Sequence, residues 1–245
     1  MGLQYWRWQK LFTAEGVALE QQAKLEEEQE ALQIQILSNL PSLGFHNLLS
    51  DWAFLQYLQY FGNLEHRQIT GYGLADDYFE AIIKYDPYYF EPYIFISSTM
   101  SLYAAQPQRG IELQRQGLAS LTPKTPPNSY SIWRQIGIDE LLFLGDHQAA
   151  IRSHEIAAEW ASQSPAPRAE RAEQSFKDTA EFLKANPQDP QVQANAWLQV
   201  VAAAQDDRTR RIAIEQIEAA GYELVPVDTG RFTVRPKDET PVGEP

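Results

Sequence analysis

The residues that could carry catalysis are scarce in this sequence, because its 245 residues include no cysteine and only four histidines. The lack of cysteine excludes disulfides, thiolate nucleophiles, iron–sulfur clusters and cysteine zinc sites. His147 and His154 lie seven residues apart and could share a helical face with a neighbouring carboxylate as metal ligands. Since His147 follows a turn and His154 falls at a packing position, we expect structural roles for both and predict neither a metal site nor a cofactor.

One short motif matches a catalytic motif. Residues 228–230 read Asp-Thr-Gly, the sequence with which aspartic proteases hold their nucleophilic water. That fold needs a β-rich domain around each of two carboxylates, whereas this sequence has one copy, 15 residues before its C-terminus, so we interpret it as a hairpin turn. A phosphate-binding loop is also excluded, because TGYG at 70–73 is too short and lacks Lys-Ser or Lys-Thr. The sequence therefore predicts a protein that is not an enzyme.

Composition limits the class of partner. Acidic residues outnumber basic ones 33 to 20, which gives a formal net charge of −13. Such a chain repels a phosphate backbone, so nucleic acid is excluded as a partner. Apolar residues make up 44% of the chain, enough for one domain with a sizeable core or two small ones. No apolar run approaches the roughly 20 residues that cross a bilayer, so we expect a soluble chain.

The first twelve residues differ from the rest, because aromatic rings alternate there with basic side chains. Such rings suit the headgroup level of a membrane, where cations face anionic lipid. We predict a juxtamembrane segment at 1–12, with packing of the rings on the domain as the alternative. The predicted localisation is membrane-associated, either peripheral or anchored by a segment absent from this chain, and otherwise cytoplasmic. The residues predicted to meet the membrane interface are Tyr5, Trp6, Arg7, Trp8 and Lys10.

Helix-forming residues dominate the elements that follow. Residues 13–40 are rich in Ala, Glu, Gln and Leu without proline, which predicts a long helix that Pro41 ends. Its acidic run at 26–30 is interpreted as a solvated face. Leu25 and Leu32 belong to a stripe that recurs every seven residues but is too interrupted to predict a sustained coiled coil. The predicted segments are 13–49 for this helix and its connection, 50–165 for three helical hairpins, 166–221 for a helical cap, and 222–245 for a β-hairpin and flexible tail.

The hairpins repeat. Trp52, Tyr93 and Trp133 each open the first helix of a hairpin, 41 and then 40 residues apart. An aliphatic residue follows each of them after three positions. This arrangement lets the second helix of each pair lie close against the first.

This pattern resembles the tetratricopeptide-repeat family. In the second helix, Ala75, Phe79 and the closing Pro87 also match the family's positions. The resemblance covers residues 51–165 and implies an all-α, TPR-like α-solenoid of antiparallel helical hairpins. The units depart from the family in length, being near 40 residues rather than 34, and Gly110 and Gly117 replace two alanines of the middle unit. Residues 43–63 also resemble bacterial, partly cyanobacterial, repeat proteins that follow a membrane anchor.

The resemblance implies a concave surface that binds protein segments, so we expect a non-enzymatic scaffold or assembly factor. We expect the partner to be a protein or peptide that belongs to a membrane complex. The cyanobacterial likeness implies that this membrane is the photosynthetic membrane. Fifteen of the 29 aromatic residues lie between Trp52 and Tyr103, and they leave a second hypothesis open, a tyrosine-rich groove for a lipid, pigment or glycan. We expect Trp52 and Leu55 to be buried behind the groove. The predicted groove residues are Tyr57, Tyr60, Glu91, Ser98 and Arg134.

Overall fold

The computed structural model describes residues 2–186, 189–228 and 231–237, with side chains from Val17 onward except those of residues 228 and 231. These residues are mostly helical, with one small two-stranded antiparallel sheet, so the all-α prediction is confirmed at this level. The elements are α1 (Gly2–Asn39), α2 (His46–Gly62), α3 (Leu64–Thr70), α4 (Ala75–Tyr85), α5 (Glu91–Ser97), the π-helix η1 (Ser98–Tyr103), α6 (Pro107–Leu118), α7 (Tyr130–Leu142), α8 (His147–Ser162), α9 (Ala169–Ala185), α10 (Pro190–Ala203), α11 (Asp207–Ala219), β1 (Tyr222–Asp228) and β2 (Arg231–Pro236).

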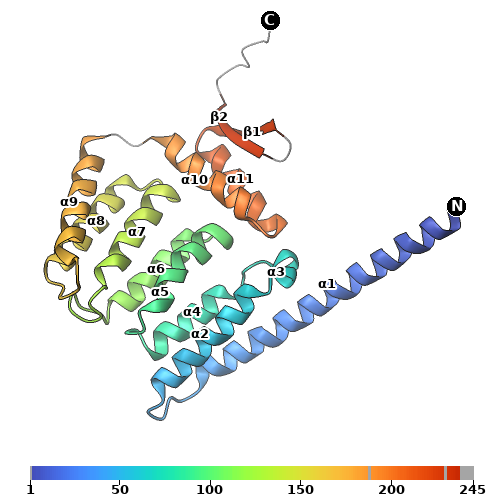
Figure 1. Ribbon diagram of the computed structural model, residues 1–245, viewed down its shortest axis with the longest axis horizontal. Coiled ribbons are helices and arrows are strands. Elements are labelled where there is room, and N and C mark those ends of the chain that lie inside the picture. Colours follow the sequence, from blue (N-terminus) through green and yellow to red (C-terminus); the bar gives the residue numbers. More distant parts are fainter. Residues whose placement is uncertain (1, 187–188, 229–230, 238–245) are drawn as a thin grey trace, which may run out of the picture.

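Three pairs of helices pack along one another: α2 with α4, α5 and η1 with α6, and α7 with α8. Figure 1 shows these pairs side by side in chain order. The left-handed backbone of Gly145, at φ +64°, turns the chain between α7 and α8. One helix was not predicted. This helix, α3, lies in the connection between α2 and α4, which we expected to be a long turn. The Asn63 side chain caps it by accepting a hydrogen bond from the backbone N–H of His66 at 3.4 Å.

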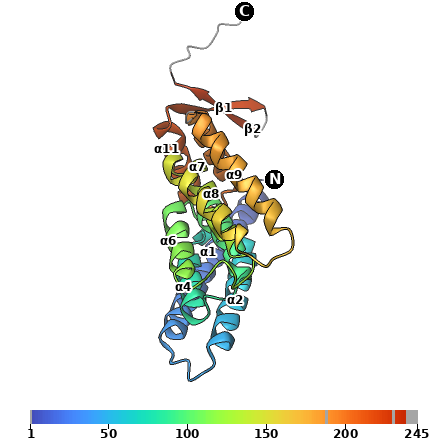
Figure 2. The same cartoon turned by 90° about the vertical axis from the view of Figure 1, so that its left-hand side faces the viewer.

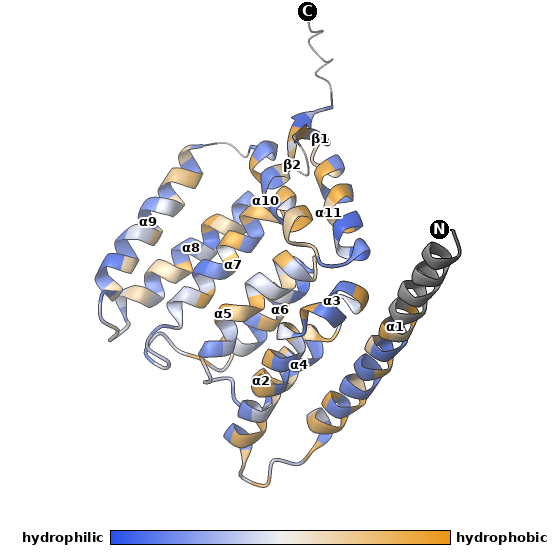
Figure 3. Cartoon of the chain, turned by 45° about the vertical axis from the view of Figure 1, so that its right-hand side comes forward, coloured by the Kyte–Doolittle hydropathy of each residue, from blue (hydrophilic) through white to orange (hydrophobic). Residues whose placement is uncertain are grey.

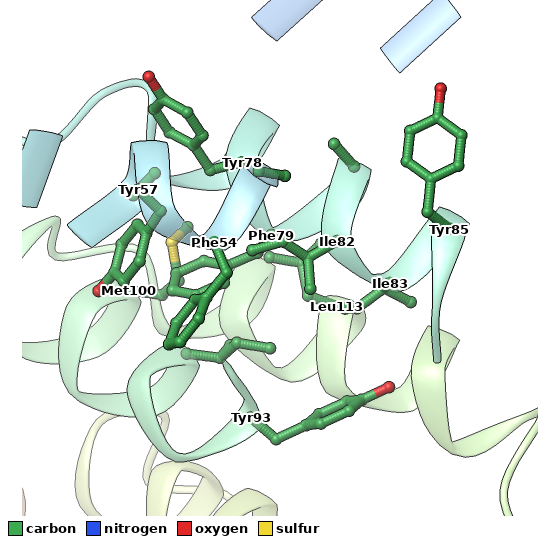
Figure 4. Packing of buried hydrophobic residues seen from close by; sticks show 14 of the residues in the cluster. Phe54, Tyr57, Tyr78, Phe79, Ile82, Ile83, Tyr85, Tyr93, Met100 and Leu113 are labelled. Atoms are coloured by element: carbon green, nitrogen blue, oxygen red, sulfur yellow. The ribbon is translucent and has the colours of Figure 1, made fainter. Parts of the chain in front are cut away.

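Aromatic side chains fill the space between α2, α4 and α5 (Figure 4). The ring centroid of Tyr57 lies 4.6 Å from that of Phe79 and 6.1 Å from that of Phe95. On the other side of α5, Tyr93 packs onto α6 at Gly117, where a Cβ atom would lie 1.8 Å from the tyrosine hydroxyl. A glycine is therefore needed at position 117, because the tyrosine ring occupies the space that a Cβ atom would take.

The C-terminal elements form a second core around Trp197, Ile217 and Val234, contributed by α10, α11 and β2. The indole Nε1 of Trp197 donates to the carbonyl oxygen of Phe143 after α7, at 3.2 Å. The hydroxyl of Thr209 donates to the carbonyl oxygen of Tyr103 at the end of η1, also at 3.2 Å. These two bonds attach the second core to the ends of the helical pairs. Figures 1 and 2 show the β-hairpin at one end of the molecule and the α1–α2 connection at the opposite end.

The first helix, α1, is continuous over 38 residues and begins at Gly2 rather than at Thr13. At 1.5 Å per residue it is about 57 Å long. Its second half packs on α3 and α4 with Ala23, Ile34 and Leu37 buried. Near its end, the Tyr85 hydroxyl of α4 donates to the carbonyl oxygen of Leu37 at 2.5 Å. The rest of the chain thus holds α1 along one side of the first helical pair.

Candidate interaction surface

The two tyrosines expected in the groove lie in the core instead. Tyr57 and Tyr60 have no exposed surface, so the prediction that they line an open groove is wrong. The Tyr57 hydroxyl is 2.6 Å from the hydroxyl of Thr99 on η1. The Tyr60 hydroxyl accepts from the backbone N–H of Leu74 at 3.1 Å. Burial raises the pKa of both phenols, which keeps them neutral.

The cause of this error is a shift of one residue in the register of the first unit. Tyr93 is buried and Trp133 is half-buried, and the residue 40 positions before Tyr93 is the buried Ala53, not Trp52. Trp52 and Leu55, expected behind the groove, are 54% and 53% exposed. Because a helix turns about 100° per residue, this shift brings the tyrosines inward and the tryptophan outward.

Three other groove residues are exposed as expected. Glu91 and Ser98 lie on the outer side of α5 and at the start of η1, and Arg134 lies on α7. The Ser98 hydroxyl donates to the carbonyl oxygen of Phe95 at 3.1 Å, which leaves its oxygen free to accept further bonds. Their part in binding stays a prediction.

The largest concentration of exposed apolar side chains lies on α1, α2 and the connection between them. Twelve of the eighteen large apolar residues that are exposed in the described part of the chain fall between Val17 and Leu64. Figure 3 shows α1 and α2 meeting at their connection and diverging from it, with apolar residues on both helices. We define the α1–α2 apolar face by Leu25, Leu32, Ile36, Leu40, Leu43, Phe45, Leu48, Trp52 and Leu55.

The buried Arg67 and two glutamates of α1 hold α1 against α3. Arg67 on α3 is 1% exposed, and its guanidinium donates to the carbonyl oxygen of Gly71 at 2.9 Å. The same group lies 3.5 Å from a carboxylate oxygen of Glu27 and 3.7 Å from one of Glu30. Burial raises the pKa of both carboxyls despite the pull of Arg67. The prediction that the acidic run is a solvated face is therefore wrong for Glu27 and Glu30, because both side chains face α3.

A second polar cluster lies at the junction of α5, η1 and α7. Asp139 is fully buried and accepts from the Ser97 hydroxyl at 2.8 Å, while Gln135 donates to the same hydroxyl at 2.7 Å. Burial raises the pKa of Asp139 to about 7. Among the described residues, its Oδ2 has no hydrogen-bond partner. Because the group is sealed from solvent, we interpret it as part of the packing against the π-helix rather than as a reactive acid.

A cleft of about 630 Å³ opens between α7, α9 and α10. Its wall is largely apolar, with Leu141, Phe182 and Val192, and includes His147. The Nε2 atom of His147 is 2.6 Å from the carbonyl oxygen of Leu183. The cleft has the size of a small-molecule site.

His147 and His154 each contact a backbone carbonyl oxygen. His154 is buried with Nδ1 2.8 Å from the carbonyl oxygen of Ala150, and burial lowers its pKa. Gly137 makes room for this ring, because a Cβ atom there would lie 2.5 Å from Nδ1. Within the described ranges, no group of three or more His, Asp or Glu side chains could hold a metal ion. In those same ranges, no helix combines the length and the apolar character that spanning a bilayer requires.

Two predicted features fall partly outside the described residues. Tyr5, Trp6, Arg7, Trp8 and Lys10 belong to the first turns of α1, but their side chains are among those not described. Thr229 and Gly230 are also outside the described residues, while Asp228 pairs with Arg231 in the hairpin. The pairing of β1 with β2 agrees with a turn at this motif.

Comparison with protein-family models finds no family that matches this chain, and comparisons with curated proteins and with solved structures find no match either. The resemblance to the tetratricopeptide-repeat family stays a prediction.

Proposed function

We propose that this protein is a non-enzymatic interaction scaffold or assembly factor, built as a TPR-like stack of helical hairpins, that binds a protein partner at a membrane surface. The observation that carries the proposal is the α1–α2 apolar face. The opposite side of α1 is already buried against α3 and α4, and that of α2 against α4 and α5, so this face is additional apolar surface rather than part of the core.

Exposed apolar area of this extent favours a binding function. Soluble monomers rarely leave a large contiguous apolar patch in water, and such patches mark interaction sites. Trp52 is a candidate hot spot, since tryptophan dominates binding energy when a partner covers it. Leu43, which is 82% exposed in the connection, extends the patch around the end of the hairpin.

The membrane part of the proposal rests on the sequence of residues 1–12. Its aromatic and basic residues suit a membrane interface, which would place the apolar face near a subunit of a membrane complex. The acidic body disfavours nucleic acid as the partner.

Site-specific photocrosslinking in the source cells tests the proposed face. A photoreactive phenylalanine analogue at Trp52 should give a discrete adduct with one protein, identified by mass spectrometry. The same analogue at Phe232, which is 47% exposed on β2 and lies in the β-hairpin away from the face, is the matched control. Adducts of equal yield at both positions, or none at Trp52, would contradict the proposal.

The cleft between α7, α9 and α10 favours a second function, binding of a small apolar ligand. Tyr57 and Tyr60 are buried, so they cannot line the ligand groove that the sequence suggested. The candidate ligand site is instead the cleft that Leu141 and Phe182 line. A lipid extract that protects wild-type protein but not Phe182→Ser from thermal unfolding would support it.

A further inference from the structure

We propose that the segment that occupies the α1–α2 apolar face is a basic amphipathic α-helix of another protein. This inference rests on the proposed function and specifies the chemistry of its partner. Three observations carry it: the spacing of the exposed apolar side chains, the burial of the opposite side of both helices, and the sign of the charges beside them.

The spacing is that of a coiled-coil seam. On α2 the exposed apolar residues start at the residue before the helix and alternate at three and four positions, as the a and d positions of heptads do. They are Phe45, Leu48, Trp52 and Leu55. On α1 the seam has the same alternation, with one glutamine in it. Its members are Leu25, Gln29, Leu32 and Ile36.

The opposite sides of both helices are occupied. In the same heptad letters, Tyr57 on α2 and Ile34 on α1 fall at f, opposite the seam, and both are buried in the body of the protein. The two seams are therefore free while their helices are held firmly from behind. A surface with this pattern accepts an α-helix that inserts its own apolar side chains between those of the seam.

Charges beside a seam select the partner. The e and g positions flank the a and d residues, and ion pairs formed there determine which helices associate. The charged residues at these positions are all acidic. They are Glu28 and Asp51, which are exposed, and Glu26, whose carboxylate lies 3.1 Å from Nδ1 of His66 on α3. Residues 17–62 contain a single lysine or arginine, Lys24, which lies outside these positions and pairs with Glu20 at 2.5 Å. A partner helix with lysine or arginine at its own e and g positions is complementary.

The same charges disfavour two other occupants. A second copy would bring Glu28 and Asp51 against like charges, in a chain whose net charge is −13. An anionic lipid surface would be repelled for the same reason. Both occupants are outcomes of the test below.

The test uses two synthetic three-heptad peptides with leucine at a and d. One has lysine at e and g, and the other has glutamate there. We expect the lysine peptide to bind the full-length protein at low salt and to lose at least tenfold in affinity at 0.5 M NaCl, because screening weakens the ion pairs. The glutamate peptide should bind at least tenfold more weakly. Fluorescence anisotropy of a labelled peptide measures each affinity.

Variants separate the face from general attraction to an acidic protein. Trp52→Ser with Leu55→Ser should weaken binding of the lysine peptide at least tenfold, whereas Phe232→Ser on β2 should leave it unchanged. Glu28→Lys with Asp51→Lys should reverse the preference in favour of the glutamate peptide. Circular dichroism and the melting temperature of each variant establish that it is folded.

Several results would overturn the inference. Equal binding of both peptides would mean that charge does not select the partner, and photocrosslinking at Trp52 would still support the proposed function. Equal loss of binding in the Phe232→Ser control would mean that the lysine peptide adheres nonspecifically. Sedimentation equilibrium that gives a dimer abolished by Trp52→Ser would assign the face to a second copy. Sedimentation with anionic vesicles that depends on Trp52 would assign it to lipid.

Discussion

Tyr60 and Trp52 lie eight residues apart on α2 and face opposite environments. The Tyr60 ring lies under Arg67, whose guanidinium carbon is 3.9 Å from the ring centroid. Tyr60→Ala would remove this contact and leave a cavity, so we expect a loss of about 3 to 5 kcal/mol in the free energy of unfolding. Trp52→Ala removes a half-exposed side chain and should cost about 1 kcal/mol or less. Urea unfolding of both variants checks this, and equal losses would contradict the burial pattern.

Asp139 should make stability depend on pH. Its pKa is raised from 3.8 to about 7, so the folded protein holds a proton that the unfolded chain has released between these values. The free energy of unfolding therefore falls as pH rises through this range, by up to about 4 kcal/mol. Asp139→Asn removes this dependence while its amide oxygen still accepts from Ser97.

Urea unfolding at pH 5 and pH 8 compares the two proteins. The free energy of unfolding of the variant minus that of wild type should be larger at pH 8 than at pH 5. If this difference in free energy of unfolding is the same at both pH values, the pKa of Asp139 is not raised in the folded protein.

At this scale, the sequence predicted less about the candidate site than about the core. Tyr57 and Trp52 are both large, partly apolar and on the same helix, so from the sequence either residue can serve as the inward anchor. Which one is buried depends on the neighbours Phe79 and Phe95, which come from other helices. A shift of one residue therefore leaves helix prediction intact and reverses the assignment of the faces.

The position of α1 depends on its contacts with α3. Arg67→Gln would leave Glu27 and Glu30 half-buried without their cation, which typically destabilises such a site by about 3 to 5 kcal/mol. We expect α1 to open locally, so that trypsin cleaves after Lys24 at least tenfold faster while α4 keeps its protection from hydrogen exchange.

Arg115→Gln is the matched control for this prediction. Arg115 pairs with Glu140 at 2.6 Å, away from α1. Its loss should leave cleavage after Lys24 unchanged. Equal acceleration in both variants would show that the site opens only through global unfolding.

Helices were predictable as elements where caps and breakers mark them. Pro41 follows α1, and Gly145 with Asp146 separates α7 from α8, where the Asp146 side chain accepts from the N–H of Ala149 at 2.8 Å. The short helix α3 and the π-helix η1 were not predicted. The sequence of η1 belongs to a segment that favours one continuous helix, and η1 packs between α4, α6 and α10, so its wider turn depends on tertiary contacts.

The whole molecule combines an acidic body with a basic, aromatic start, and this asymmetry sets the last prediction. A net charge of −13 should repel anionic liposomes, so any binding to them requires a local exception. Arg7 and Lys10 provide cations next to Trp6 and Trp8, which suit the headgroup region.

Deletion of residues 2–12 should therefore abolish sedimentation with anionic liposomes. The deletion shortens α1 but spares Ala23, Ile34 and Leu37, its buried residues among the described side chains, so circular dichroism should show only the loss of about three helical turns. Replacing both Arg7 and Lys10 by alanine should weaken binding most at low salt, where the attraction between cations and lipid is least screened. Replacing both Trp6 and Trp8 by alanine should weaken it at every salt concentration, because burial of the rings does not depend on screening. Sedimentation of the deleted protein to the same extent as the full chain would remove residues 1–12 from the membrane hypothesis and leave the acidic body without a means of approaching anionic lipid.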